Sequence, residues 1–309
     1  MNQQRIIQDK KGDSIQGSYS RLFRVRWQEC GAYGIVDPIH YIYFMQETSM
    51  AHATEHGYTT GRELKKGRAW VIRETEIEYL RPIRYGDTVK VSMQIGELRR
   101  TSVTRFYEFN VETTGVLVAR SRSEFVCVNV ETQLPIAIPE DVITEFFPAG
   151  IPGKPLPRNR FPKAPHPAHN VFQMRKKVEF RDLDMLRHVN NATYLSYMIT
   201  SGIEATVRGG LPWKLVMDSK DMNVSSWSRV LYQGQAKIED ELEITTYCSD
   251  VGQSSAVFHD SIVRVSDRAP IALGHTRWVW INRNTLMPHP MPAEVRAAIE
   301  KLAIIDEAG

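Results

Sequence analysis

Hydrophobic and polar positions along the chain predict the same series of elements twice. Segments rich in β-branched and aromatic residues indicate strands, and longer periodic segments indicate helices. In the first half, strands are predicted at 22–28, 69–79, 88–98, 105–113 and 117–130, and helices at 38–56 and 139–146. In the second half, a strand-like run at 178–180 precedes a helix at 191–208, strands near 215–224, 234–248, 255–266 and 272–282, and a helix at 292–303.

The order of these elements predicts the fold class. One strand, one long helix and then four consecutive strands do not alternate as a parallel α/β fold does. We therefore expect an antiparallel sheet that buries one long helix in each half, which is an α+β architecture. Asp37 is the predicted cap of the first long helix, with Pro38 in its first turn.

An internal repeat explains why the series occurs twice. Tyr41 aligns with Tyr194, and Val142 with Val295, both 153 positions apart. In the middle, residues 77–87 align with 225–235, five residues out of register. A period this long indicates a duplicated domain rather than a solenoid.

The segment 148–170 separates the two copies and contains seven of the sixteen prolines. It cannot continue a helix or a central strand, so it is predicted to be a semi-rigid, largely extended linker. The predicted domains are 20–147 and 171–303, and the first 19 residues are interpreted as a polar tail.

Composition narrows the functional class. The chain has 309 residues, of which 42% are hydrophobic and 24% charged, values typical of a soluble globular protein with two domains. No apolar run approaches the ~18 residues of a membrane span. The start of the chain has no apolar signal segment, so a cytoplasmic location is expected. A net charge of +3 gives no argument for nucleic-acid binding.

Candidate chemistry is concentrated between residues 181 and 197. Asp182, Asp184, His188, Asn190 and Asn191 lie within ten positions, immediately before the second long helix. Asn190 or Asn191 is a suitable N-cap. A helix N-terminus offers unpaired N–H groups and partial positive charge, which suit a developing oxyanion.

The sequence DLDMLRHVNNATYL in this stretch resembles the signature of hotdog-fold acyl thioesterases, particularly the 4-hydroxybenzoyl-CoA thioesterase-like and plant acyl-ACP thioesterase groups. The resemblance extends over both copies. It implies two tandem hotdog domains, each an antiparallel sheet wrapped around a long central helix. It further implies hydrolysis of an acyl-CoA or acyl-carrier-protein thioester, an acyl chain between the two helices, and no cofactor beyond the CoA or phosphopantetheine of the substrate.

Residue by residue, the resemblance assigns the catalytic carboxylate to Asp184 and the conserved run of the family to 188–191. Leu186 departs from the plant enzymes, which carry an asparagine there. In the first copy, Gly31 matches Asp184 and Ile35 matches His188. The sequence therefore predicts one competent constellation per chain, with the first copy supplying the opposite wall.

Each candidate also has a plainer interpretation. Asp184 can activate water or attack the thioester directly, or it can simply cap a turn. His188 can act as acid, base or orienting group, or bond to backbone. Asn190 and Asn191 fit a cap better than direct catalysis, and Asp182 fits a structural role. A metal site is disfavoured because these ligands share one short loop.

Four further residues are candidate substrate contacts. Glu47 and Thr48 lie on the first long helix, where some hotdog thioesterases carry catalytic groups. Arg81 and Arg84 belong to a locally basic stretch that can meet the phosphates of CoA or phosphopantetheine. A solvated helix face and scattered surface arginines are the competing interpretations.

Two other functions remain open. The run VDPIHY at 36–41 superficially resembles the turn of R-specific enoyl hydratases, although Ile35 stands where those enzymes carry an aspartate. A non-catalytic acyl-thioester-binding module is the second alternative. Acyl length, CoA versus carrier protein and oligomeric state stay open, and the resemblance allows a homo-oligomer formed through exposed sheet edges.

Overall fold

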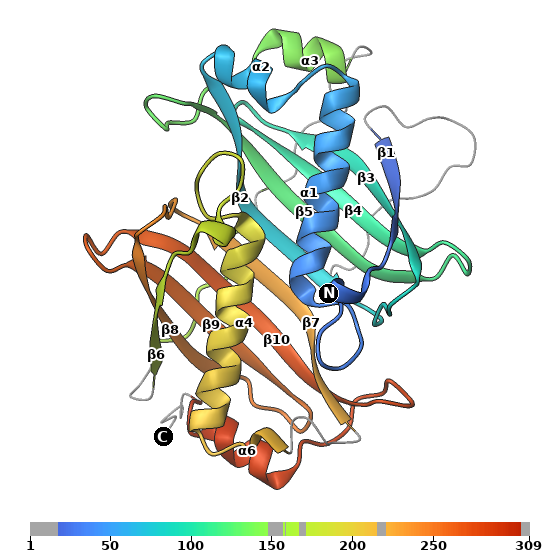
Figure 1. The fold of residues 1–309 in the computed structure, drawn as a ribbon, viewed down its shortest axis with the longest axis vertical. Coiled ribbons are helices and arrows are strands. Elements are labelled where there is room, and N and C mark those ends of the chain that lie inside the picture. Colours follow the sequence, from blue (N-terminus) through green and yellow to red (C-terminus); the bar gives the residue numbers. More distant parts are fainter. Residues whose placement is uncertain (1–17, 148–156, 158, 167–170, 215–220, 304–309) are drawn as a thin grey trace.

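The computed structural model describes residues 18–147, 157, 159–166, 171–214 and 221–303, which form a ten-stranded antiparallel sheet with two long helices along one face (Figure 1). The strand order is β1-β3-β4-β5-β2-β7-β10-β9-β8-β6, so each copy supplies five neighbouring strands. The predicted α+β architecture of two tandem units is confirmed.

The first copy begins its long helix where the sequence predicts. Asp37 accepts a hydrogen bond from the Ile39 N–H at 3.1 Å, and Pro38 occupies the first helical position. The short helix after it was not predicted, because six residues are too few to show a helical period. The elements are β1 (Ser18–Arg24), α1 (Pro38–Glu55), α2 (Thr60–Lys65), β2 (Arg68–Tyr79), β3 (Thr88–Leu98), β4 (Ser102–Val111), β5 (Leu117–Asn129) and α3 (Glu140–Phe146).

The second copy repeats this series. Asn190 rather than Asn191 is the cap of its long helix, and its side-chain oxygen accepts the Ala192 N–H at 2.9 Å. The elements are β6 (Phe172–Lys177), α4 (Asn191–Arg208), β7 (Asp221–Tyr232), β8 (Glu241–Ser249), β9 (Ser255–Arg264), β10 (Pro270–Asn282) and α6 (Ala293–Glu300).

The repeat keeps its offset through the middle of the copies, so the predicted five-residue slip there is wrong. Both ends of β7 lie 153 positions after the corresponding ends of β2. The Val36 N–H donates to the Ile83 carbonyl, and the Val189 N–H donates to the Ala236 carbonyl, again 153 positions on. The alignment of 77–87 with 225–235 matches similar turn residues, whereas strand pairing within the sheet determines the register of the repeat.

Boundaries near the two loops also differ from prediction. The predicted strand at 22–28 is β1 followed by a 3₁₀ helix at Trp27–Glu29, and 178–180 leads into a second 3₁₀ helix at Phe180–Asp182. The second-copy strands predicted near 215–224 and 234–248 are β7 and β8. Residues 215–220 lie outside the described chain, as do 1–17, 148–156, 158 and 167–170. The described part of the linker contains neither helix nor strand.

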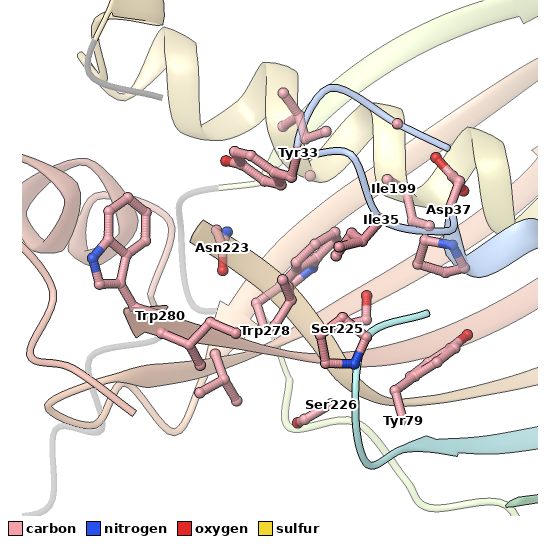
Figure 2. Close-up of a pocket in the computed structure, with 18 of the residues that line it drawn as sticks. Tyr33, Ile35, Asp37, Tyr79, Ile199, Asn223, Ser225, Ser226, Trp278 and Trp280 are labelled. Carbon is pink, nitrogen blue, oxygen red and sulfur yellow. The ribbon is translucent and has the colours of Figure 1, made fainter. Parts of the chain in front are cut away.

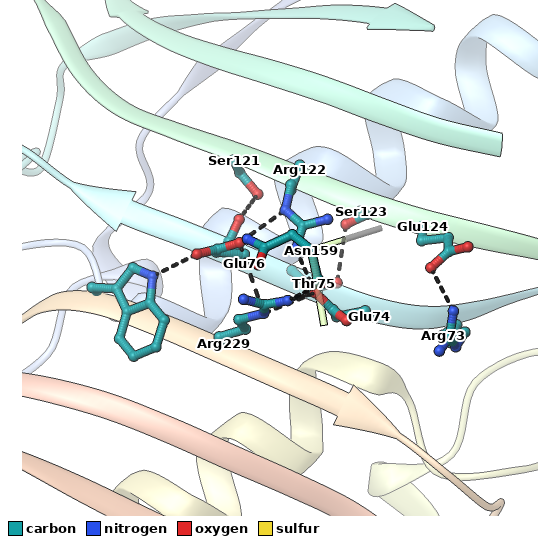
Figure 3. A network of polar contacts seen from close by, with 11 residues as sticks. Arg73, Glu74, Thr75, Glu76, Ser121, Arg122, Ser123, Glu124, Asn159 and Arg229 are labelled. Atoms are coloured by element: carbon teal, nitrogen blue, oxygen red, sulfur yellow. Dashed lines mark hydrogen bonds and ion pairs between the residues drawn. The ribbon is translucent and has the colours of Figure 1, made fainter. Parts of the chain in front are cut away.

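The two copies meet where β2 pairs with β7 (Figure 1), over only five residue pairs from Glu74↔Leu231 to Glu78↔Trp227. Buried ion pairs reinforce this short seam, as Figure 3 shows. One oxygen of Glu74 accepts hydrogen bonds from Arg122 at 2.6 Å and from Arg229 at 2.8 Å. Arg229 is only 3% exposed, so its charge depends on these partners.

The long helices run antiparallel and overlap near the middle of the molecule (Figure 1). Their contact belongs to a core shared by both copies, which includes Tyr41, Met45, Leu195 and Met198. Because of this overlap, the loop that precedes each long helix lies against the other copy. None of the described helices is long and apolar enough to cross a membrane.

Candidate active site

A tight loop between Leu183 and Val189 carries the candidate catalytic residues. The Asp184 N–H donates to the His188 carbonyl at 2.9 Å, and the Arg187 N–H donates to the Asp184 carbonyl at 3.0 Å. Closing this turn requires a left-handed residue, and Arg187 has φ of 64°. The backbone thus brings the side chains of Asp184 and His188 to the same side of the loop, where an Asp184 oxygen and His188 Nδ1 are 3.5 Å apart.

Asp184 combines a structural contact with a free oxygen. Its Oδ1 accepts the Leu186 N–H at 2.8 Å, which is the turn-capping role considered above. Among the described residues, Oδ2 has no hydrogen-bond donor. The Asp184 side chain is 22% exposed and that of His188 16%. The carboxylate is therefore held in a fixed position while one oxygen remains open to a water or a substrate.

The start of α4 lies beside this carboxylate and is fixed to the other copy. The amide of Asn190 exchanges hydrogen bonds with the amide of Gln46 on α1, at 3.2 and 3.3 Å. Asn190 is thus a cap and an interhelical contact rather than a free catalytic group. Asn191 is the first residue of α4, and an N–H at this position has no acceptor within the helix.

Asp182 has the structural role that was expected. It is buried, and one of its oxygens accepts hydrogen bonds from the Tyr197 hydroxyl at 2.6 Å and from the Glu179 N–H at 2.7 Å. Burial and the Asp182 contact raise the pKa of Tyr197, so the hydroxyl keeps its proton. Glu29 accepts the Arg26 N–H in the same way in the first copy.

A cavity of about 160 Å³ extends from the loop into the first copy. Leu186 is part of its lining and comes from the second copy, whereas Ser49, Met50 and Ala53 of α1 form a wall on the other side. The loop of one copy therefore opens onto a pocket built by the other copy. Sequence patterns did not identify the remaining wall residues, including Trp70, Arg105 and Phe125, because strand-facing side chains give no local signal for a cavity.

None of the four predicted substrate contacts lines this cavity. Glu47 forms an ion pair with Arg21 at 2.7 Å, and the buried Thr48 hydroxyl donates to the Phe44 carbonyl of its own helix. Arg81 lines a different cavity. Arg84 is exposed in the turn after β2, where its N–H bonds to Asp87. Glu47 and Thr48 thus satisfy local side-chain contacts that sequence spacing alone does not reveal.

The corresponding loop of the first copy has the same backbone and different chemistry. Gly34 lies 153 positions before Arg187 and has φ of 71°, so the left-handed turn is retained. Gly31 and Ile35 occupy the positions of Asp184 and His188, so this loop has neither the carboxylate nor the imidazole. The two loops thus form a pair in which one has lost the reactive groups.

Comparison with protein families identifies the superfamily of the chain. The model of the thioesterase-like superfamily matches residues 25–146 and, again, 178–299. The chain belongs to this superfamily. The two matched segments together cover most of the chain, and each contains one long helix with the strands around it.

Similar proteins agree with this assignment. An acyl-[acyl-carrier-protein] hydrolase of Cuphea viscosissima is 22% identical over 269 residues, covering 84% of this chain and 62% of the relative. The dodecanoyl-[acyl-carrier-protein] hydrolase of Umbellularia californica is 23% identical over 271 residues, covering 84% and 67%. The chain thus spans about 62% of the length of the first of these curated relatives.

Solved structures show the same fold. A putative oleoyl thioesterase from Lactobacillus plantarum superimposes with a TM-score of 0.74 at 18% identity, covering 86% of this chain and 97% of that one. The 12:0-ACP thioesterase of Umbellularia californica gives 0.69 at 22% identity, covering 85% and 94%. The hydratase alternative finds no support among these similar proteins.

Proposed function

We propose that this chain hydrolyses an acyl thioester to a free acid and a thiol. The observation that carries the proposal is the position of the Asp184–His188 loop at a pocket lined by apolar side chains of the other copy. The names of the relatives, which are hydrolases of acyl-carrier-protein thioesters, support the same reaction class.

In the proposed mechanism, Asp184 accepts a proton from water as the water oxygen bonds to the thioester carbon. General base action of this kind contributes about 10²–10⁴-fold. The oxyanion that forms is stabilised by the N–H at the start of α4. Collapse of the intermediate breaks the C–S bond, and the departing thiolate takes up the proton. His188 orients the carboxylate or relays this proton, and no group outside the chain, the substrate and water is needed.

The small cavity suggests which acyl groups fit. Its volume of about 160 Å³ is close to that of an engineered cavity of about 150 Å³ that binds benzene. We therefore expect a preference for short or ring-sized acyl groups. A thiol-release assay over acyl-CoA and acyl-carrier-protein substrates of increasing length tests this, and no thiol release from any substrate would favour a non-catalytic binding module.

Arg187 is the cation that we propose for the phosphate of the phosphopantetheine arm. It belongs to the catalytic loop, is exposed, and has no carboxylate partner among the described residues. A non-glycine residue in left-handed backbone costs roughly 1 kcal/mol, yet this copy keeps arginine where the other has Gly34. A role in binding the phosphate explains why arginine stands next to His188, although glycine would adopt this backbone conformation at lower cost.

Replacing Arg187 with Gly is expected to leave the protein as stable as before, or more stable by about 1 kcal/mol, because glycine tolerates this φ. The KM for acyl-CoA or acyl-carrier-protein substrates should rise by roughly five-fold, since an exposed ion pair contributes up to about 1 kcal/mol. Steady-state kinetics and thermal unfolding measure both effects.

Substrates and a matched variant isolate the phosphate contact. Acyl-N-acetylcysteamine thioesters lack the phosphate, so Arg187→Gly should hydrolyse them as the unchanged protein does. Arg187→Lys keeps the charge and should retain most of the affinity. Equal losses on substrates with and without phosphate would show that Arg187 acts on the loop rather than on the arm.

A further inference from the structure

A second and larger cavity, of about 690 Å³, lies in the second copy between α4 and the sheet (Figure 2). Ile199 and Ile203 of α4 line it from one side, and Trp278 and Trp280 of β10 line it from the sheet. Tyr33, from the loop before α1, reaches into the same cavity. Its volume falls within the ~300–1,000 Å³ typical of small-molecule sites.

The repeat relates this cavity to the small one position by position. Tyr33, which lines the large cavity, stands 153 positions before Leu186, which lines the small one. Met50, which lines the small cavity, stands 153 positions before Ile203, which lines the large one. The two cavities are therefore the equivalent pockets of the two copies, each roofed by a loop of the other copy. The larger pocket can therefore hold a larger ligand of the same general shape.

Two exchanges at equivalent positions favour the larger size of the second cavity. Trp70 lines the small cavity, and Asn223 occupies the equivalent position in the large one. An amide in place of an indole leaves space along the strand. Ser49 of α1 is likewise replaced by Gly202 of α4, which removes a side chain from the helix face.

The loop at the larger cavity lacks the groups proposed for hydrolysis. Gly31 and Ile35 replace the carboxylate and the imidazole. The remaining acid, Asp37, is engaged in capping α1 through the Ile39 N–H. A ligand that enters this cavity meets mainly apolar walls, with polar groups such as Asn223 and Ser225 among them, and no carboxylate–imidazole pair to activate water, so it is bound without being converted.

We propose that this cavity is a second acyl site, which binds the chain of a free fatty acid. The walls suit an alkyl chain, and Arg81 at the rim provides a cation for the carboxylate. Arg81 has no ion-pair partner among the described residues. The proposal rests on the proposed function only in taking a free carboxylic acid as the ligand, because that is the product class of thioester hydrolysis. The volume of about 690 Å³ is what favours a longer chain here than in the small cavity of about 160 Å³.

Tryptophan quenching by ω-bromododecanoic acid tests the proposal, since bromine quenches indoles that it contacts. Trp213, Trp278 and Trp280 line the large cavity, and Trp70 lines the small one. We expect Trp70→Phe to retain saturable quenching and the triple variant Trp213→Phe/Trp278→Phe/Trp280→Phe to lose most of it. Quenching that disappears only with Trp70→Phe would overturn the proposal.

Filling the cavity gives a second, independent measurement. Asn223→Phe places a ring where the first copy has Trp70, and Ile203→Phe fills the space from the helix. Each added ring excludes part of the alkyl chain from the cavity. Calorimetric titration with dodecanoic acid should show a Kd about tenfold higher for every two methylenes of the chain that the ring excludes. Unchanged affinity in both variants, with both folded by thermal unfolding, would contradict the assignment.

A competition experiment distinguishes the two sources of an acyl chain. Dodecanoic acid is expected to displace the brominated probe, and displacement by the non-hydrolysable thioether S-dodecyl-CoA alone would overturn the fatty-acid assignment. No thioester is consumed in any of these measurements. Their outcome is therefore separate from that of the hydrolysis assay, and either proposal can fail without the other.

Discussion

Asp184→Asn is expected to lower kcat for thioester hydrolysis by about 10²–10⁴-fold, the usual contribution of a general base. Asparagine keeps an oxygen that can accept the Leu186 N–H, so the turn is preserved while the ability to take a proton is lost. Substrate affinity should change little, because the acyl pocket is built mainly by the other copy. Single-turnover kinetics with a binding measurement separates these two quantities.

Asp87→Asn is the matched control for this experiment. Asp87 is another half-buried loop carboxylate that accepts a backbone N–H, from Arg84 at 2.8 Å, and it lines neither cavity. It should retain full turnover and full stability. Full turnover in Asp184→Asn itself would remove the proposed base and leave Asp184 with its turn-capping role alone.

The second large effect is expected at the seam between the copies. Glu74→Leu should destabilise the protein by about 3–5 kcal/mol, because the buried Arg229 loses its closest carboxylate. Arg229 then keeps an ion pair with Glu76, which is 3.8 Å long, and a hydrogen bond to the Asn159 carbonyl at 2.9 Å. Trp227 also donates to Glu76 at 2.9 Å, so its fluorescence can report on the seam during urea unfolding.

Two variants determine whether the lost charge pairing is the cause. Adding Arg229→Met to Glu74→Leu should recover much of the stability, since an apolar pair of similar volume avoids an unpaired buried charge. Glu241→Ala breaks an ion pair with Arg175 whose side chains are 46% and 61% exposed, and it should cost less than about 1 kcal/mol. An equal loss of stability in Glu74→Leu and Glu241→Ala would argue that burial of the ion pair is not the reason for the effect at the seam.

The same network of hydrogen bonds and charges also sets the pKa of the Glu76 carboxylate at the seam. Burial pushes the pKa of Glu76 upward, but the Trp227 hydrogen bond and the charges of Arg122 and Arg229 outweigh it and hold the pKa below its ordinary value. Glu76 therefore contributes stability above the pKa of an unfolded glutamate. That contribution is lost as the pH falls through the lowered pKa.

The sequence determined the local structure and the repeat. Asp37 caps its helix as predicted, and Asn190, one of the two predicted candidates, caps the other, because a cap bonds to the backbone two positions away and needs no distant partner. The offset of 153 at the ends of the copies is also the offset of the strands. The same offset identified Gly31 and Ile35 as the lost counterparts of Asp184 and His188.

Only the tertiary structure decided what those residues face. The overlap of α1 and α4 places the loop of each copy over the pocket of the other. The sequence pattern of the two copies is the same, so it does not indicate which pocket each loop faces. Glu47 was predicted as a substrate contact from its position on the first long helix, and Arg81 from its charge, but Glu47 pairs with Arg21 and Arg81 lines the other cavity. Capping and periodicity act over a few residues, whereas pockets arise from contacts between segments far apart in the chain.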